Sequence, residues 1–223
     1  MTPVGNDVDA MWKNITEGRH GIGPITRFDA TGYKARLAAE VKGFDPLDYL
    51  ERNEARRLDL YAQYAIAAAD QAVRDSGIMS AIEPERFSVY FGSGIGGMTT
   101  FENEFEKLLG GGSRKVSPLF VPMMITNLAA GNIAIRFNAK GSCTAVVTAC
   151  ASGTDSVGTA YRAIKHGYTD AAIAGGSEAA ITRMGVAGFT NMTALSTSNG
   201  RGRLKTFFRK TFNVILVKKA KPR

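Results

Sequence analysis

The hydrophobic pattern of the chain is clearest around residues 144–167, where it changes from strand type to helix type. Residues 144–148 form a β-branched run, typical of a strand covered on both faces of a sheet. From Val157 the apolar positions recur at helical spacing, through Ala160, Tyr161 and Ile164, which predicts an amphipathic helix. Gly167 is a typical residue to end it. The pattern therefore predicts a buried strand, an abrupt turn and a helix.

Further segments of both types surround this unit. Asp45 followed by Pro46 is a typical helix start and predicts that the longest helix, with an alanine-rich stripe, begins there and ends at Gly77. Strands are expected over 87–91 and 171–174. Shorter helices are expected over residues 7–17, 100–109 and 127–137, and within 182–199. A strand, a helix and a strand in succession predict an α/β fold with a parallel sheet.

Composition sets the broad class of the protein. The chain has 223 residues, 44% of them hydrophobic, which is enough for one large α/β domain. It contains no apolar run long enough for a membrane span and no secretion signal, so we expect a cytoplasmic protein. Cys143 and Cys150 lie about 23 Å apart if the strand between them is extended, too far for a disulfide. Reduced thiols fit a cytoplasmic location.

The net charge of +8 belongs to one end of the chain. Residues 200–223 hold nine Lys or Arg and no acid, which leaves 19 basic and 20 acidic residues in 1–199. We therefore predict a domain over 1–199, for which no nucleic-acid partner is expected, and a basic tail over 200–223. The tail has two interpretations: a frameshifted or disordered segment, or a native segment that binds nucleic acid or anionic lipid.

A glycine-rich stretch follows the predicted strand 87–91. Residues 92–97 satisfy the pattern G-x-G-x-x-G, so a dinucleotide site must be considered. No second strand ending in an acidic residue follows at the expected distance of about 20 residues. A tight turn with close helix packing is the favoured alternative.

Cys150 is the candidate catalytic residue. It lies at or just before the N-terminus of the predicted helix, where backbone N–H groups and the helix dipole favour a thiolate. Its small neighbours leave space around the sulfur, although a buried structural cysteine is the alternative. For Cys143, inside the strand, the buried role is preferred. No metal site is expected, because no second ligand stands at metal-binding spacing.

Four motifs resemble those of the β-ketoacyl-acyl-carrier-protein synthases of type II, the chain-elongating condensing enzymes: residues 92–97, 147–153, 174–179 and 194–197. The likeness runs from about residue 2 to 199. It implies a thiolase-like fold, here the N-terminal half of a duplicated βαβαβαββ architecture, and a homodimer without a cofactor. It also implies fatty acid elongation from acyl and malonyl acyl carrier protein, with Cys150 taking the acyl group as a thioester.

The sequence departs from this family in three ways. The family's first strand, which precedes Thr2, has no counterpart. The family's second half, with two catalytic histidines, a lysine and a glycine-rich phenylalanine loop, has none either. His166 lies about 24 Å along the helix from Cys150, and His20 matches no catalytic residue. The resemblance therefore implies an incomplete fold, with condensation lost or impaired and at most partial acyl transfer.

Two other functions remain open from the sequence. The chain could be a non-catalytic protein that keeps dimer or carrier contacts, or a binding protein that acts through its basic tail. The positively charged loop 110–115 is either an ordinary surface loop or a lip that faces an acidic carrier or a second subunit.

Overall fold

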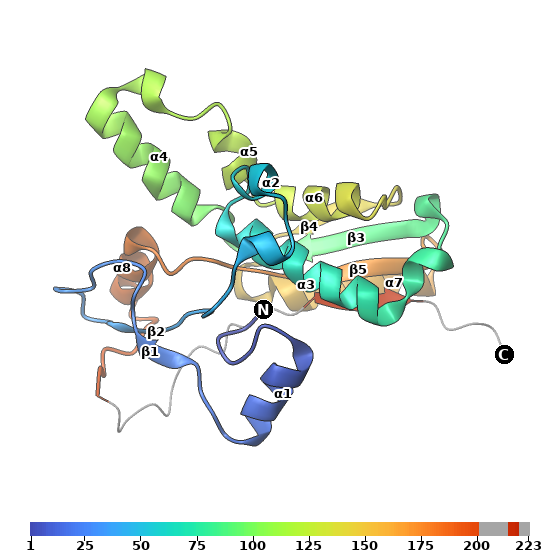
Figure 1. Ribbon diagram of the computed structural model, residues 1–223, viewed down its shortest axis with the longest axis horizontal. Coiled ribbons are helices and arrows are strands. Elements are labelled where there is room, and N and C mark those ends of the chain that lie inside the picture. Colours follow the sequence, from blue (N-terminus) through green and yellow to red (C-terminus); the bar gives the residue numbers. More distant parts are fainter. Residues whose placement is uncertain (201–213, 219–223) are drawn as a thin grey trace. The chain divides into compact units, whose positions relative to one another are not determined.

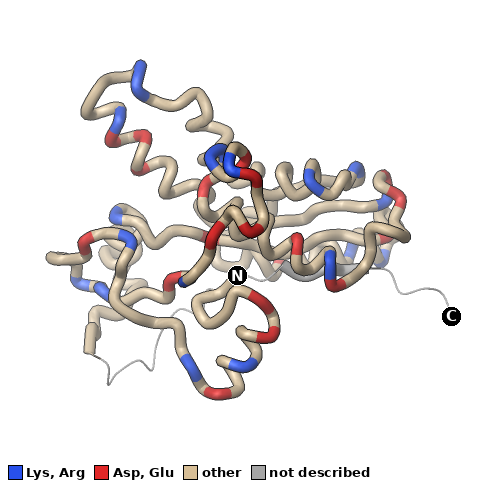
Figure 2. Tube along the Cα trace, viewed as in Figure 1, with Lys and Arg blue, Asp and Glu red and all other residues tan. Residues whose placement is uncertain are grey.

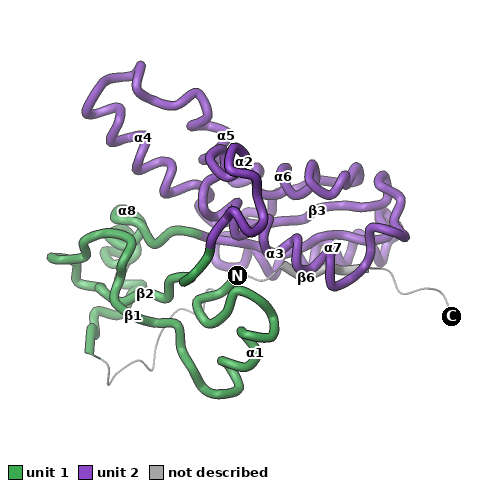
Figure 3. The backbone as a smooth tube through the Cα atoms, viewed as in Figure 1, with its two compact units in different colours: residues 1–44, 179–211 green, residues 45–178, 212–223 purple. Residues whose placement is uncertain are grey.

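The computed structural model describes residues 1–200 and the backbone of residues 214–218. It divides the chain into two compact units (Figure 3), which are residues 1–44 with 179–211 and residues 45–178 with 212–223. Most of the predicted basic tail, residues 201–213 and 219–223, lies outside the described residues.

The second unit is built on a four-stranded sheet in the order β4-β3-β5-β6 (Figure 1). The strands are β3 (Phe87–Gly92), β4 (Cys143–Val146), β5 (Ala171–Gly176) and β6 (Val214–Lys218). β3 is parallel to both β4 and β5, and β6 is antiparallel to β5. Every residue of β3 and β5 is buried. The predicted parallel α/β sheet is therefore confirmed.

Helices cover the two faces of this sheet. The chain passes from β3 to β4 through α6 (Leu128–Arg136) and from β4 back across β3 to β5 through α7 (Ser152–Lys165). These crossovers run in opposite directions, so right-handed connections place α6 and α7 on opposite faces. Tyr90, Ala172 and Ala174 form the core beneath α7. α3 (Leu60–Ser76) packs beside α6.

The predicted start of the longest helix is wrong. Asp45 caps only the 3₁₀ turn η1 (Pro46–Asp48), and the short helix α2 (Arg52–Ala55) follows before α3 begins. Asp59 is the N-cap of α3, and its carboxylate also accepts hydrogen bonds from the N–H and hydroxyl of Thr100, both at 2.7 Å. Burial raises the pKa of this carboxyl, and the bonds from Thr100 oppose that shift. Gly77, with φ of 59°, ends the helix as predicted.

The predicted burial of the strand before Cys150 is also wrong. Within the described part of the chain β4 pairs with β3 alone, at the edge of the sheet. Cys143 and Thr144 are exposed, whereas Ala145 and Val146 are half-buried. Tyr161, which the periodicity placed on the apolar face of its helix, is 57% exposed, and Ile135 in α6 is 80% exposed.

A helical hairpin follows β3. It consists of α4 (Met98–Gly111), the 3₁₀ turn η4 (Ser113–Lys115) and α5 (Phe120–Met124) (Figure 1). Glu104 closes the hairpin, because its carboxylate accepts a 2.7 Å hydrogen bond from the Ser117 N–H and pairs with Lys107. The unit also contains the 3₁₀ turns η2 (Ile78–Ser80) and η3 (Pro84–Arg86).

The first unit is smaller. It contains α1 (Val8–Thr16), α8 (Arg183–Asn191) and the antiparallel pair β1 (Ile22–Pro24) and β2 (Leu37–Ala39). Ile25, Ala35 and Val186 form its core. Asp7 caps α1, in agreement with the predicted helix over 7–17, although the apolar residues Val8, Trp12 and Ile15 of that helix are exposed.

Basic and acidic residues are interspersed along the described chain (Figure 2). None of the helices in this part of the chain combines the length and the apolar character that a membrane crossing requires.

Candidate active site

Cys150 lies on a sharp elbow between β4 and α7. Ala149–Ala151 form a single 3₁₀ turn, η5, and α7 begins at the next residue. Ala149 has φ of 50°, a left-handed conformation that costs energy for a residue with a Cβ. Cys150 is exposed. The sequence therefore located the cysteine correctly, at the N-terminus of a helix and at the carboxyl ends of parallel strands, where open α/β sheets bind ligands.

Ser152 holds the elbow from within. Its hydroxyl donates to the Ala149 carbonyl at 2.8 Å and accepts from the Thr148 N–H at 3.0 Å. The side chain is fully buried, so these bonds have little competition from water. Ser152 thus ties the left-handed residue to the first turn of α7.

Two strand-terminal glycines let the sheet approach the start of α7. A Cβ on Gly92 would lie 2.6 Å from the Val146 carbonyl oxygen and 2.7 Å from the Ser152 Cβ. A Cβ on Gly176 would lie 2.9 Å from the Gly92 carbonyl oxygen. Distances below 3.0 Å do not occur for real Cβ atoms, so only glycine fits at these two positions without a shift of the backbone.

The glycine-rich turn after β3 is occupied by a carboxylate of the chain itself. Glu178, which follows β5, accepts hydrogen bonds from the N–H groups of Gly94 and Ile95, at 2.8 and 3.2 Å. Its other oxygen accepts from the Ser93 hydroxyl at 3.3 Å, and that hydroxyl accepts from the Gly96 N–H. The N–H groups that would contact a phosphate in a dinucleotide site are therefore already used, which favours the turn interpretation.

The other candidate residues of the sequence lie elsewhere. Cys143 is exposed on the edge strand, not buried as predicted, and the partial burial of its thiol raises its pKa. His166 caps the C-terminus of α7, the opposite end of that 14-residue helix from Cys150. His20 lies on an exposed loop of the other unit. The described residues contain no group of three or more His, Cys, Asp or Glu that could hold a metal ion.

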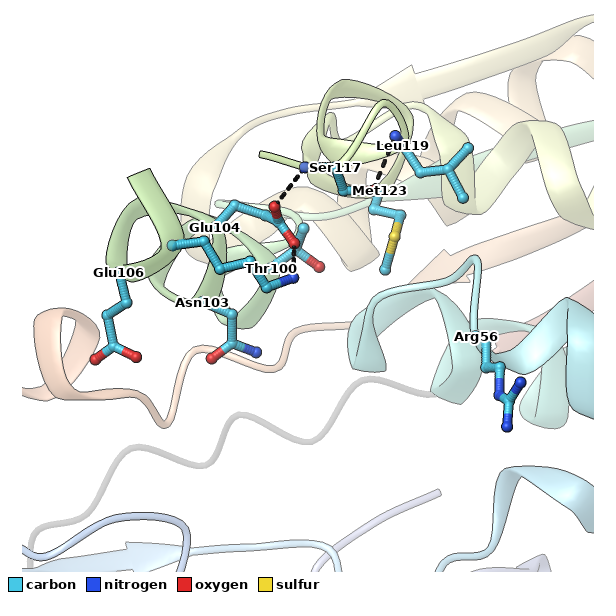
Figure 4. Close-up of a pocket in the computed structure, with 9 residues that line it drawn as sticks. Arg56, Thr100, Asn103, Glu104, Glu106, Ser117, Leu119 and Met123 are labelled. Carbon is cyan, nitrogen blue, oxygen red and sulfur yellow. Dashed lines mark hydrogen bonds and ion pairs between the residues drawn. The ribbon is translucent and has the colours of Figure 1, made fainter. Parts of the chain in front are cut away.

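A groove of about 630 Å³ lies between the helical hairpin and the residue that ends α2 (Figure 4). Figure 4 shows Glu104 directed toward Ser117, with Arg56 and Glu106 at opposite sides. The groove combines charged, polar and apolar side chains, which are those of Arg56, Thr100, Asn103, Glu104, Glu106, Lys107, Ser117, Leu119 and Met123.

The roles of Ser152 and Glu178 were not predicted from the sequence. Both lie in motifs quoted above, residues 147–153 and 174–179, but only Cys150 carried a recognisable chemistry there. For Glu178 a signal did exist. An acidic residue two positions beyond the glycine pair that ends β5 can reach the turn that follows the neighbouring strand.

Comparison with known proteins gives consistent matches. Residues 1–211 match the family model "Beta-ketoacyl synthase, N-terminal domain". A curated relative from Staphylococcus aureus, 3-oxoacyl-[acyl-carrier-protein] synthase 2, is 46% identical over 200 residues, which are 89% of this chain and 50% of the relative. The chain thus spans about half the length of the curated relatives it matches.

Solved structures agree with the sequence matches. The ishigamide ketosynthase/chain length factor has a TM-score of 0.81 and 29% identity, over 87% of this chain and 49% of that one. A beta-ketoacyl synthase from Burkholderia phymatum has a TM-score of 0.80 and 27% identity, over 98% of this chain and 57% of that one. The thiolase-like fold expected from the sequence is thereby confirmed over about half of the architecture.

Proposed function

The chain belongs to the beta-ketoacyl synthase family, and from that premise we propose that it is the N-terminal half of a 3-oxoacyl-acyl-carrier-protein synthase that elongates fatty acids in the cytoplasm. Its own share of the chemistry is acyl transfer. The Cys150 thiolate attacks the thioester carbonyl of an acyl carrier, the carrier thiol leaves, and the acyl group remains on Cys150 as a new thioester.

The complete protein would then carry out a condensation. Malonyl carrier loses carbon dioxide, and the resulting carbanion attacks the acyl thioester. The 3-oxoacyl carrier forms while the Cys150 thiolate is released. We propose that the backbone N–H of Cys150, within the 3₁₀ turn η5, donates to the oxyanion of either tetrahedral intermediate. His166 cannot assist the carbanion step, because it lies at the far end of α7.

The observation that carries this proposal is the setting of Cys150. It is exposed, it follows a strained residue, and it lies at a helix N-terminus. Cys143 is also exposed but lies on a strand, so the chain contains its own control thiol. The two residues differ in backbone setting.

Acyl transfer to the purified chain tests the proposal. After incubation with hexanoyl-acyl carrier protein, intact-mass and peptide analysis should find one hexanoyl group per chain, on Cys150. Cys150→Ser should abolish the adduct and Cys143→Ser should retain it. The proposal fails if the acyl group is found on Cys143, or if no adduct forms while iodoacetamide still alkylates Cys150.

For the carrier itself we propose a docking surface formed by the groove and the tip of the hairpin. Arg56 and Lys107 line the groove together with Glu104 and Glu106, so the positive charge of the surface comes from Arg114 and Lys115, which are exposed in η4. A positive surface of this kind would attract an acidic carrier and speed its association. The polar and apolar groove residues would contact the carrier once it is bound.

Charge reversal tests this surface. Arg114→Glu combined with Lys115→Glu should lower the second-order rate constant of acyl transfer by about tenfold at low ionic strength, and the difference should shrink as salt is added. Lys165→Glu, at the exposed C-terminal end of α7, is the matched control and should have little effect. Equal losses in both variants would exclude a specific docking surface.

We propose further that the chain forms a homodimer through β4. In the described chain this strand pairs on one side only and exposes Cys143 and Thr144, so a second copy can add its own β4 to the open edge. Sedimentation should show dimers that Thr144→Lys converts to monomers, while Thr31→Lys on an exposed turn does not. A monomeric wild-type chain at micromolar concentration would exclude this interface.

A further inference from the structure

We propose that Glu178 is a positioning residue for Cys150, acting through the turn that follows β3. This inference rests on the proposed function of Cys150 as the acyl acceptor. Glu178 does not contact the substrate. It holds the turn that packs against the elbow, and the elbow determines the position of the Cys150 thiol.

The first step of the argument is the contact between Glu178 and the turn. The carboxylate accepts three hydrogen bonds, from the N–H groups of Gly94 and Ile95 and from the Ser93 hydroxyl. The Gly96 N–H donates in turn to the Ser93 hydroxyl at 3.0 Å. Hydrogen bonds to a charged acceptor are stronger than those between neutral groups. One side chain thus holds the first part of the turn, from Ser93 to Ile95.

The second step is the contact between the turn and the elbow. A Cβ placed on Gly94 would lie 3.0 Å from the Glu178 Oε2 atom and 3.3 Å from the Ala149 carbonyl oxygen. Gly94 is thus held between the carboxylate and the residue that precedes Cys150. Ala149 is the strained residue of the site, with φ of 50°. A strained conformation persists only where its surroundings determine it, and Gly94 is one of those surroundings.

The third step separates the two supports of Ala149. Ser152 binds its carbonyl from the helix side, and the turn packs against it from the side of the sheet. Loss of Glu178 would release the second support while leaving the first in place. Ala149 could then relax toward an ordinary conformation, and Cys150 would rotate away from its present direction. The expected defect is a misplaced thiol in a folded protein.

The test compares alkylation of the two thiols by iodoacetamide, followed by peptide mass spectrometry. Glu178→Ala should slow alkylation of Cys150 by at least about fivefold, because rotation of Cys150 out of its present exposed position reduces the access of the reagent to the sulfur. Cys143 lies on β4, apart from the turn and the elbow, so it is the internal control and its rate should be the same in the wild type and in Glu178→Ala. Glu178→Gln should restore the Cys150 rate, since its amide oxygen can still accept from the two N–H groups of the turn.

Rescue by glutamine separates positioning from simple stabilisation. The proposal is overturned if folded Glu178→Ala alkylates Cys150 at the wild-type rate, or if both cysteines change by the same factor. If Glu178→Ala shows no cooperative melt, Glu178→Asp is judged by the same two criteria, since it keeps the charge but shortens the reach.

The alkylation assay needs no carrier protein, so it is independent of the proposed function. Selective slowing in Glu178→Ala, together with a wild-type chain that takes no acyl group, would reject the acyl-transfer function and retain the positioning role. If the wild-type chain and Glu178→Ala acylate Cys150 at the same rate, the acyl-transfer function is retained and the positioning role is rejected.

Discussion

Replacement of Gly92 by alanine should disrupt the contact between the sheet and the start of α7. The added Cβ would lie 2.6 Å from the Val146 carbonyl oxygen, 2.7 Å from the Ser152 Cβ and 2.8 Å from the Ser152 carbonyl oxygen. Two of these atoms are backbone atoms of packed elements and cannot rotate away. Overpacking of a core costs about 1–3 kcal/mol, and the rigidity of these neighbours places Gly92→Ala near 3 kcal/mol.

The matched control is Gly158→Ala, within α7. There the nearest atom to an added Cβ is the flexible Arg162 Nη1, at 3.9 Å, so the substitution should stabilise the helix by about 0.5–1 kcal/mol. Urea unfolding, combined with hydrogen exchange of peptides from β3 and α7, measures both effects in the unit concerned. A Gly92→Ala variant within about 0.5 kcal/mol of the wild type would refute the close approach described here.

Two carboxylates give further predictions. Asp59→Ala should lower the free energy of unfolding by about 2 kcal/mol, because Asp59 caps α3 and also binds the first turn of α4. Asp45→Ala is the control. It removes the cap of a 3₁₀ turn only and should lower the free energy of unfolding by less than about 1 kcal/mol. The hydrogen bond from Lys107, and then that from the Ser117 N–H, lower the pKa of Glu104. Its stabilising contribution, about 1 kcal/mol, should be complete above the unfolded-state pKa of about 4.3 and disappear as the pH falls through the lower folded-state pKa. The difference in unfolding free energy between wild type and Glu104→Gln, measured from pH 7 downward, should shrink in that window; a constant difference would contradict it.

The elements that the sequence predicted well are those whose signal is local. β3 contains aromatic residues and a valine, β5 is a run of small apolar residues with one isoleucine, and both strands lie where they were expected. α7 follows from its period, and Gly167, with φ of 78°, lies just beyond its end. The position of Cys150 before that helix follows from the change of period alone, so the central residue of the candidate site needed no knowledge of the sheet.

The two wrong predictions, the burial of β4 and the start of the longest helix, depend on the order of strands in the sheet and on competition between two N-cap residues. Residues 143–146 have the composition of an interior strand, but no local pattern states which strands will flank them, and β4 lies at an edge. Asp45 and Asp59 are both good N-caps. The chain uses each of them, but extended backbone at Glu51 and Asp59 interrupts the helix that was expected to continue from Asp45.

The glycine-rich turn shows how a three-dimensional pairing changes the meaning of a motif. In the register of the sheet Gly92 lies opposite Gly176, so the residues just beyond β3 and β5 leave the sheet side by side. Glu178 lies two positions past that pair and can place its carboxylate where a bound phosphate would otherwise sit. In this chain the G-x-G-x-x-G turn therefore binds a carboxylate of the chain itself. The turn is held in place by that contact, and it packs against the elbow that carries Cys150.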